Sequence, residues 1–141
     1  MLDLLFLAKH HFFEIESENT FPHSSGIASS ASSMSSLALC LMDFEKKSNP
    51  KISKSFFLKK ASFLARLGSG SACRSIQGPV VSWGQSEFYK NSSQLFGTPL
   101  KKIDKVFKSY QDSILIIDKQ EKKVSMKIIK DQNIFNYKII K

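Results

Sequence analysis

Arginine is scarce in this sequence, and its scarcity argues against a nucleic-acid-binding protein. Of the 21 basic residues only Arg66 and Arg74 are arginine, although Arg is the side chain that most often reads guanine edges and phosphates bidentately. Lysine therefore carries most of the formal net charge of +9, and no recognition motif accompanies that charge. We expect no specific nucleic-acid partner.

Cysteine and long apolar runs are also scarce. The two cysteines are too few for a disulfide framework and lack metal-site spacing, which favours a reduced, cytoplasmic setting. Cys40 lies in an apolar run and is predicted to be a small core residue. No apolar stretch approaches the roughly 20 residues that a membrane span needs, and the opening run with Asp3 is a poor signal peptide. We therefore expect no membrane partner.

Helix and strand patterns both occur without regular βαβ alternation, which favours the α+β class. Residues 11–20 alternate apolar and polar positions, as a half-buried strand does. Residues 28–45 predict a helix whose apolar stripe is Met34, Leu37, Ala38, Leu41 and Met42. The remaining predicted elements are a helix over 52–67, strands over 79–83 and 113–118, and a loop over 84–100.

The first segment that suggests a binding site joins the first strand to the first helix and reads PHSSGIASSA over residues 22–31. Backbone N–H groups at a helix N-terminus, aided by the helix dipole, bind anions. Gly26 lets the backbone approach a phosphate closely, and Ser29 and Ser30 add hydroxyls that bond phosphate oxygens or Mg²⁺. The equally good alternative is a serine-capped helix without a ligand.

The second such segment is GSGSACRS, residues 68–75. Its glycines free the backbone, Ser69 and Ser71 offer hydroxyls, and Arg74 supplies a bidentate cation for phosphate or carboxylate. A flexible Gly/Ser linker is the alternative interpretation. We favour anion binding, because a linker has no need of Cys-Arg and both flanking segments carry the patterns of ordered elements.

These two segments carry a family resemblance. The Pro-x-x-x-Gly-Ile-Ala-Ser-Ser-Ala run resembles the phosphate-binding motif of the GHMP kinase superfamily. Read with the preceding Glu18-Asn19-Thr20-Phe21, it is similar to the version in diphosphomevalonate decarboxylases. The run from Arg66 to Ser75, followed by Gly78 and Trp83, is far more specific to the decarboxylases. The similarity extends over residues 12–124.

The resemblance implies a partial GHMP-kinase-type fold, the ribosomal protein S5 domain 2-like N-terminal domain, with residues 1–124 as its central part. It implies ATP-dependent decarboxylation of mevalonate 5-diphosphate to isopentenyl diphosphate in isoprenoid biosynthesis, with Mg²⁺ and a homodimeric full-length enzyme. The residues that it assigns to ATP phosphates are Pro22, His23, Ser24, Ser25, Gly26, Ala28, Ser29 and Ser30, the last two also to Mg²⁺. Those that it assigns to the substrate are Ser69, Gly70, Ser71 and Arg74.

The sequence also departs from the family. Family members are more than twice as long, and their catalytic Asp lies in a half without a counterpart here, so we assign no catalytic residue. After Val124 the resemblance stops, and 11 of the 17 residues 125–141 are Ile, Lys or Asn, as in out-of-frame translation of AT-rich DNA. We therefore expect a piece truncated at both ends and inactive alone, from a disrupted or partly sequenced gene.

Two other functions stay open. One is another GHMP-type small-molecule kinase, or a decarboxylase of a different mevalonate derivative, because the superfamily motif does not set the substrate. The other is a non-enzymatic basic protein that binds nucleic acid or partners. A steep loss of binding with salt and indifference to ATP would indicate that last function.

Overall fold

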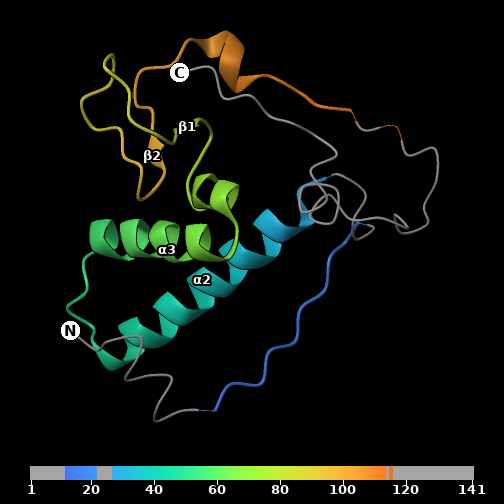
Figure 1. Ribbon diagram of the computed structural model, residues 1–141, viewed down its shortest axis with the longest axis vertical. Helices are drawn as coiled ribbons and strands as arrows, with labels where there is room; N and C mark the ends of the chain where they lie inside the picture. Colours follow the sequence, from blue (N-terminus) through green and yellow to red (C-terminus); the bar gives the residue numbers. More distant parts are fainter. Residues whose placement is uncertain (1–11, 22–26, 114, 116–141) are drawn as a thin grey trace, which may run out of the picture.

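Two helices dominate the computed structural model, which describes residues 12–21, 27–113 and 115 (Figure 1). Helix α2 spans Ser29–Ser48 and helix α3 spans Lys54–Gly68, so both predicted helices are confirmed. The connection turns at Asn49, and α3 begins where the Ser53 hydroxyl accepts a hydrogen bond from the Phe56 N–H at 3.2 Å. No helix in the described part of the chain is long and apolar enough to cross a membrane.

A short turn and a small sheet follow the helices. The 3-10 turn η1 (Gly70–Arg74) comes directly after α3. Strands β1 (Val81–Ser82) and β2 (Thr98–Pro99) pair antiparallel, with Val81 opposite Pro99, and the 3-10 turn η2 (Lys105–Lys108) comes last. The predicted strand over 79–83 is confirmed at its centre. Strand β2 lies inside the segment predicted as a loop. It forms through pairing with β1, which the local sequence does not indicate.

Small side chains form the seam between the helices, which cross in Figure 1. Helix α2 buries Ala31, Ser35, Ala38, Met42 and Glu45, and α3 buries Ala61, Ser62 and Ala65. Ala72 of η1 is also fully buried and joins the same cluster. Small residues bring two helix backbones close together, so the packing contacts come from main chain as much as from side chain.

The buried face of α2 is rotated from the predicted stripe. Ala38 and Met42 are buried as expected, whereas Met34, Leu37 and Leu41 are only half-buried. The apolar pattern correctly placed a helix, but α3 presents small residues at the contact. The small face of α2, with Ala31 and Ser35, therefore packs there in place of the leucine face.

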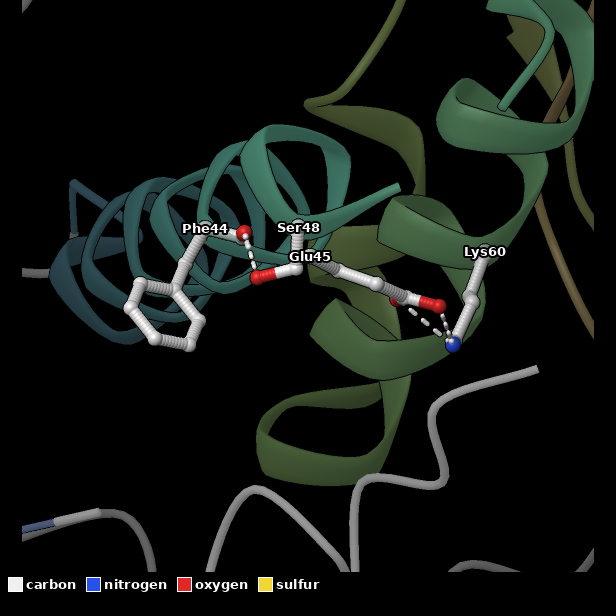
Figure 2. A network of polar contacts seen from close by, with 4 residues as sticks. All are labelled: Phe44, Glu45, Ser48 and Lys60. Atoms are coloured by element: carbon white, nitrogen blue, oxygen red, sulfur yellow. Dashed lines mark hydrogen bonds and ion pairs between the residues drawn. The ribbon is translucent and has the colours of Figure 1, made fainter. Parts of the chain in front are cut away.

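A buried ion pair joins the two helices near the C-terminal end of α2, as Figure 2 shows. Lys60 of α3 donates to both carboxylate oxygens of Glu45 of α2, at 2.7 and 2.6 Å. The Glu45 side chain is 3% exposed and that of Lys60 is 18% exposed. Beside them, the Ser48 hydroxyl donates to the Phe44 carbonyl oxygen at 3.4 Å. The pair satisfies a charge that the small-residue seam would otherwise leave buried and unpaired.

Two further expectations are wrong. Cys40 is exposed, because it lies two residues from both Ala38 and Met42 and so points to the other side of the helix. Residues 12–20 form no strand. Their alternation suits a half-buried strand, but a strand also needs a hydrogen-bonded neighbour, and the described sheet contains only β1 and β2. The predicted strand over 113–118 lies mostly outside the described residues.

Candidate functional site

The two candidate anion-binding segments meet at one pocket of about 360 Å³. The first segment contributes Ala28 and Ala31 at the N-terminus of α2, and the second contributes Ser71, Arg74 and Ser75. The approach to β1 closes the pocket with Pro79, Val80 and Val81. Residues far apart in the sequence thus line one open pocket, which Arg74, Ser71 and Ser75 share with the N-terminus of α2.

A direct contact also joins the two segments. The hydroxyl oxygens of Ser30 and Ser69 lie 3.4 Å apart, in a hydrogen bond that either can donate. Ser30 belongs to the first turn of α2, and Ser69 is the residue between α3 and η1. The contact therefore fixes the N-terminus of α2 beside the turn that carries Arg74.

The N-terminus of α2 has no side-chain cap. Its N-cap residue, Ala28, has φ 56° and ψ 39°, in the left-handed region. The Ala28 carbonyl oxygen accepts from the N–H groups of Ala31 and Ser32, at 3.0 and 3.1 Å. The serine cap of the alternative interpretation is therefore wrong, and the Ser29 and Ser30 N–H groups lie at a helix end that no described side chain caps.

One buried serine, Ser62, forms hydrogen bonds that join the turn η1 to the rest of the fold. The Ser62 hydroxyl donates to the Cys73 carbonyl oxygen at 2.7 Å and accepts from the Gly97 N–H at 2.8 Å. Inside the turn, the Cys73 thiol contacts the Gly70 carbonyl oxygen at 3.2 Å. Ala72 and Cys73 are buried, so the flexible-linker alternative for this segment is wrong.

Two glycines allow close packing around this turn. A Cβ on Gly70 would lie 3.1 Å from Cη2 of Trp83, whose indole N–H donates to the Gln94 carbonyl oxygen at 3.0 Å. A Cβ on Gly97 would lie 2.6 Å from the Cys73 carbonyl oxygen and 2.8 Å from Cγ1 of Val81. The back of η1 is therefore tightly covered, and its open side faces the pocket.

The electrostatics of the pocket favour anions. Arg74 is exposed and lines it, whereas Arg66 donates to the Leu95 carbonyl oxygen at 3.1 Å and lies over the Phe63 ring. Burial raises the pKa of the Cys73 thiol, although the positive charges of Arg74 and Arg66 act against that rise. Cys73 therefore stays a neutral thiol behind the site. No carboxylate is among the described residues that line the pocket.

The predicted site residues are only partly in the pocket. Ala28, Ser71 and Arg74 line it, Ser30 and Ser69 form the bridge beside it, and Pro22 to Gly26 lie outside the described residues. Ser29, at the helix end, and Gly70, under Trp83, are not among the lining residues.

Sequence reasoning missed other residues of the site. Ser75 follows Arg74 in the predicted run, and its hydroxyl was a usable signal. Ser62 and Gly97 carry no local signal, because only the fold brings them to η1. The described Asp residues offer no base at the pocket. Asp104 caps η2 through the Val106 N–H at 3.0 Å, and Asp112 is exposed and does not line the pocket.

Comparison with known proteins now gives the family. Residues 3–94, more than half of the chain, match the diphosphomevalonate decarboxylase-like N-terminal domain. The chain belongs to this family. No solved structure matches it. Both segments that form the pocket lie inside the matched range, which confirms the resemblance on which they were assigned.

Curated relatives resemble only part of this chain. It is 37% identical over 81 residues to diphosphomevalonate decarboxylase mvd1 of Aspergillus fumigatus, covering 57% of the chain and 18% of that protein. It is 39% identical over 71 residues to the diphosphomevalonate decarboxylase of Saccharomyces cerevisiae, covering 49% and 16%. The bovine enzyme is 36% identical over 85 residues, covering 60% and 19%. The chain thus spans about a fifth of the length of these relatives.

Proposed function

We propose that the chain forms the phosphate-binding and part of the substrate-binding wall of a diphosphomevalonate decarboxylase. In that reaction ATP phosphorylates the tertiary hydroxyl of mevalonate 5-diphosphate, and loss of phosphate and CO₂ gives isopentenyl diphosphate. One observation carries the proposal. The N-terminus of α2 and the Arg74 turn line the same pocket, so two anionic groups bound there would be neighbours.

The N-terminus of α2 suits the nucleotide. Ala28 supplies no side-chain cap, and the Ala31 N–H already donates to the Ala28 carbonyl oxygen, so the N–H groups of Ser29 and Ser30 are the donors nearest the helix end. Bound phosphate oxygens would satisfy these donors and interact favourably with the helix dipole. We assign the ATP phosphates to Ala28, Ser29 and Ser30, together with the preceding residues 22–26.

The same helix end fits a magnesium ion only in company with ATP. Mg²⁺ bound to a nucleotide keeps several waters and takes one or two protein oxygens besides the phosphates. Ser29 and Ser30 supply hydroxyl oxygens of that kind, and the described residues hold no cluster of His, Cys, Asp and Glu to bind a metal alone. Ser29 and Ser30 would help to hold the ion beside the phosphates, where it would supply positive charge to offset theirs.

The Arg74 turn suits the substrate. Mevalonate 5-diphosphate carries a carboxylate and a diphosphate, and a guanidinium binds either group through two parallel hydrogen bonds. Arg74, Ser71 and Ser75 line one side of the pocket, and Ser69 and Gly70 complete the turn beside them. Held there, the substrate would present its tertiary hydroxyl toward the nucleotide at α2, which is the geometry that phosphoryl transfer needs.

Binding of simple anions to the full 141-residue chain tests this function. We expect inorganic diphosphate and Mg·ATP to bind in calorimetric titrations, and Arg74→Ala to weaken diphosphate binding about tenfold or more by removing a charge-assisted contact. Lys108→Ala is the matched control, because Lys108 is an exposed cation on η2 away from the pocket. Equal losses in both variants would contradict the proposal and favour a basic surface without a specific site.

A further inference from the structure

Ser62 differs from an ordinary buried serine in its hydrogen-bond partners, which lie outside its own helix. Its side chain is fully buried, and its hydroxyl joins two segments that lie 11 and 35 residues away in the sequence. Ser35, the other buried serine among the described residues, donates at 2.9 Å to the Ser32 carbonyl oxygen in its own helix. A buried serine often satisfies its hydroxyl group with a hydrogen bond to a backbone carbonyl oxygen of its own helix, as Ser35 does. The contacts of Ser62 instead join α3 to two other parts of the fold.

The first contact of Ser62 fixes the peptide that precedes Arg74. The Cys73 carbonyl group belongs to the planar peptide unit that ends at the Arg74 Cα. A 2.7 Å hydrogen bond from Ser62 directs that carbonyl group into the core. The direction in which the Arg74 side chain leaves the turn depends on this orientation, although Ser62 itself does not line the pocket.

The second contact of Ser62 holds Gly97 against the same turn. Ser62 accepts the Gly97 N–H at 2.8 Å, and Gly97 is packed so closely that a Cβ there would overlap both the Cys73 carbonyl oxygen and Val81. Val81, like Arg74, lines the pocket. One hydroxyl thus bonds both to the turn that carries Arg74 and to the residue that packs against Val81.

We propose that Ser62 is a positioning residue for anion binding, acting through the Cys73 carbonyl to hold Arg74 toward the pocket. This inference rests on the proposed function, since it takes the ligand of Arg74 to be a diphosphate or carboxylate. Loss of the hydroxyl leaves a buried N–H and a buried carbonyl group without a partner. The turn then relaxes, and Arg74 loses the geometry that bidentate binding requires.

The test compares Ser62→Ala with Ser35→Ala in the full chain, with inorganic diphosphate as the probe. We expect Ser62→Ala to weaken diphosphate binding about tenfold and to shift the NMR signal of the Arg74 side-chain N–H even without diphosphate. We expect Ser35→Ala to leave both readouts unchanged at a measured loss of thermal stability. Ser62→Cys keeps a donor and acceptor at this position, with a weaker hydrogen bond and a slightly larger atom. It serves if Ser62→Ala does not fold, and we expect it to give an intermediate loss.

Two outcomes would overturn the inference. One is a Ser62 variant that keeps its diphosphate affinity within twofold and its Arg74 signal in place. The other is a Ser35 variant that loses affinity equally, since the effect would then be general destabilisation. If the unmodified chain binds no diphosphate, the proposed function fails, and the Arg74 signal alone decides whether Ser62 positions the turn.

Discussion

Ala28 starts α2 from a left-handed backbone conformation, with φ at 56°. A residue with a Cβ pays about 1–2 kcal/mol for this conformation, and such residues often lie at functional sites. This backbone conformation of Ala28 turns the chain sharply at the start of the helix. Under the proposed function, a bound anion would satisfy the helix end that Ala28 leaves without a side-chain cap.

Replacing Ala28 by glycine tests this strain. We expect Ala28→Gly to raise the free energy of unfolding by about 0.5–1 kcal/mol, because the relief of the left-handed conformation exceeds the extra freedom of glycine in the unfolded chain. Urea unfolding followed by circular dichroism measures the change. The control is Ala38→Gly in the middle of the same helix, which should be destabilising. A loss of stability in Ala28→Gly would show that the backbone is not strained.

Cys73 gives a second prediction for a single residue. Burial raises the pKa of its thiol, so the folded chain retains this proton at a pH where the unfolded chain begins to release it. The contribution of the protonated thiol to the free energy of unfolding is fully present below the ordinary thiol pKa of about 8.5. It is lost as the pH rises from there toward the higher pKa of the thiol in the folded chain. We expect stability to fall with pH in that window, and Cys73→Ala to reduce the fall.

Alkylation gives the direct measurement of the same thiol. We expect iodoacetamide at pH 8 to modify Cys40, which is exposed, well before Cys73, since only an accessible thiolate reacts rapidly. Mass spectrometry of peptides from the folded chain resolves the two sites, and urea should equalise their rates. Equal rates in the folded chain would contradict the burial of Cys73.

At the scale of elements, the seam between α2 and α3 decides whether the pocket forms. Both walls of the pocket depend on it, because the N-terminus of α2 and the turn after α3 meet only when the helices cross as they do. Gly68 shows how close the packing is, since a Cβ there would clash with the Met34 side chain. The pair of Glu45 and Lys60 joins the two helices at this crossing, and we expect it to favour this arrangement because separating the two would leave the buried Glu45 carboxylate unpaired.

Breaking that pair should be costly. We expect Lys60→Met to lower the free energy of unfolding by about 3 kcal/mol or more, because the Glu45 carboxylate is left buried without a partner. The double change Glu45→Leu with Lys60→Met should recover most of the loss. Lys47→Ala is the control, because Lys47 and Asp43 form an exposed pair at 3.1 Å on α2 that should contribute less than about 1 kcal/mol. Denaturant unfolding compares the four chains. Similar losses for Lys60→Met and Lys47→Ala would contradict this role.

At the scale of the whole molecule, the groups that anion binding needs differ from those that catalysis needs. The described pocket carries cationic and hydroxyl groups but no carboxylate, and the chain spans about a fifth of the relatives that it matches. Anions can be held by backbone amides and one guanidinium. Transfer to a tertiary hydroxyl also needs an oriented base and a cleft that excludes water.

We therefore expect the 141-residue chain to release neither phosphate nor CO₂ from mevalonate 5-diphosphate with ATP and Mg²⁺. The absence of a base among the described residues of the pocket should alone lower the rate by about 10²–10⁴-fold, and incomplete positioning should lower it further. The assay follows both products, with a full-length relative as the positive control. Turnover within tenfold of that relative would contradict the prediction and require a base among Asp104, Asp112 and Asp118.

The sequence by itself determined the two helices, the family and the two segments that line the pocket. Each rests on local pattern, namely apolar spacing, the break at Asn49-Pro50, and the order of residues around Gly26 and Arg74. These signals survive because helix formation and helix-end chemistry depend mainly on residues within a few positions.

Only the tertiary structure decided which groups meet. The buried face of α2, the pairing that creates β2, and the contacts of Ser62 with Cys73 and Gly97 all involve residues distant in the sequence. No local pattern encodes them, because each depends on the shape of the surface that packs against it. The exposed side of Cys40 was mispredicted for the same reason. A helix with apolar residues on several sides buries whichever face its neighbour fits.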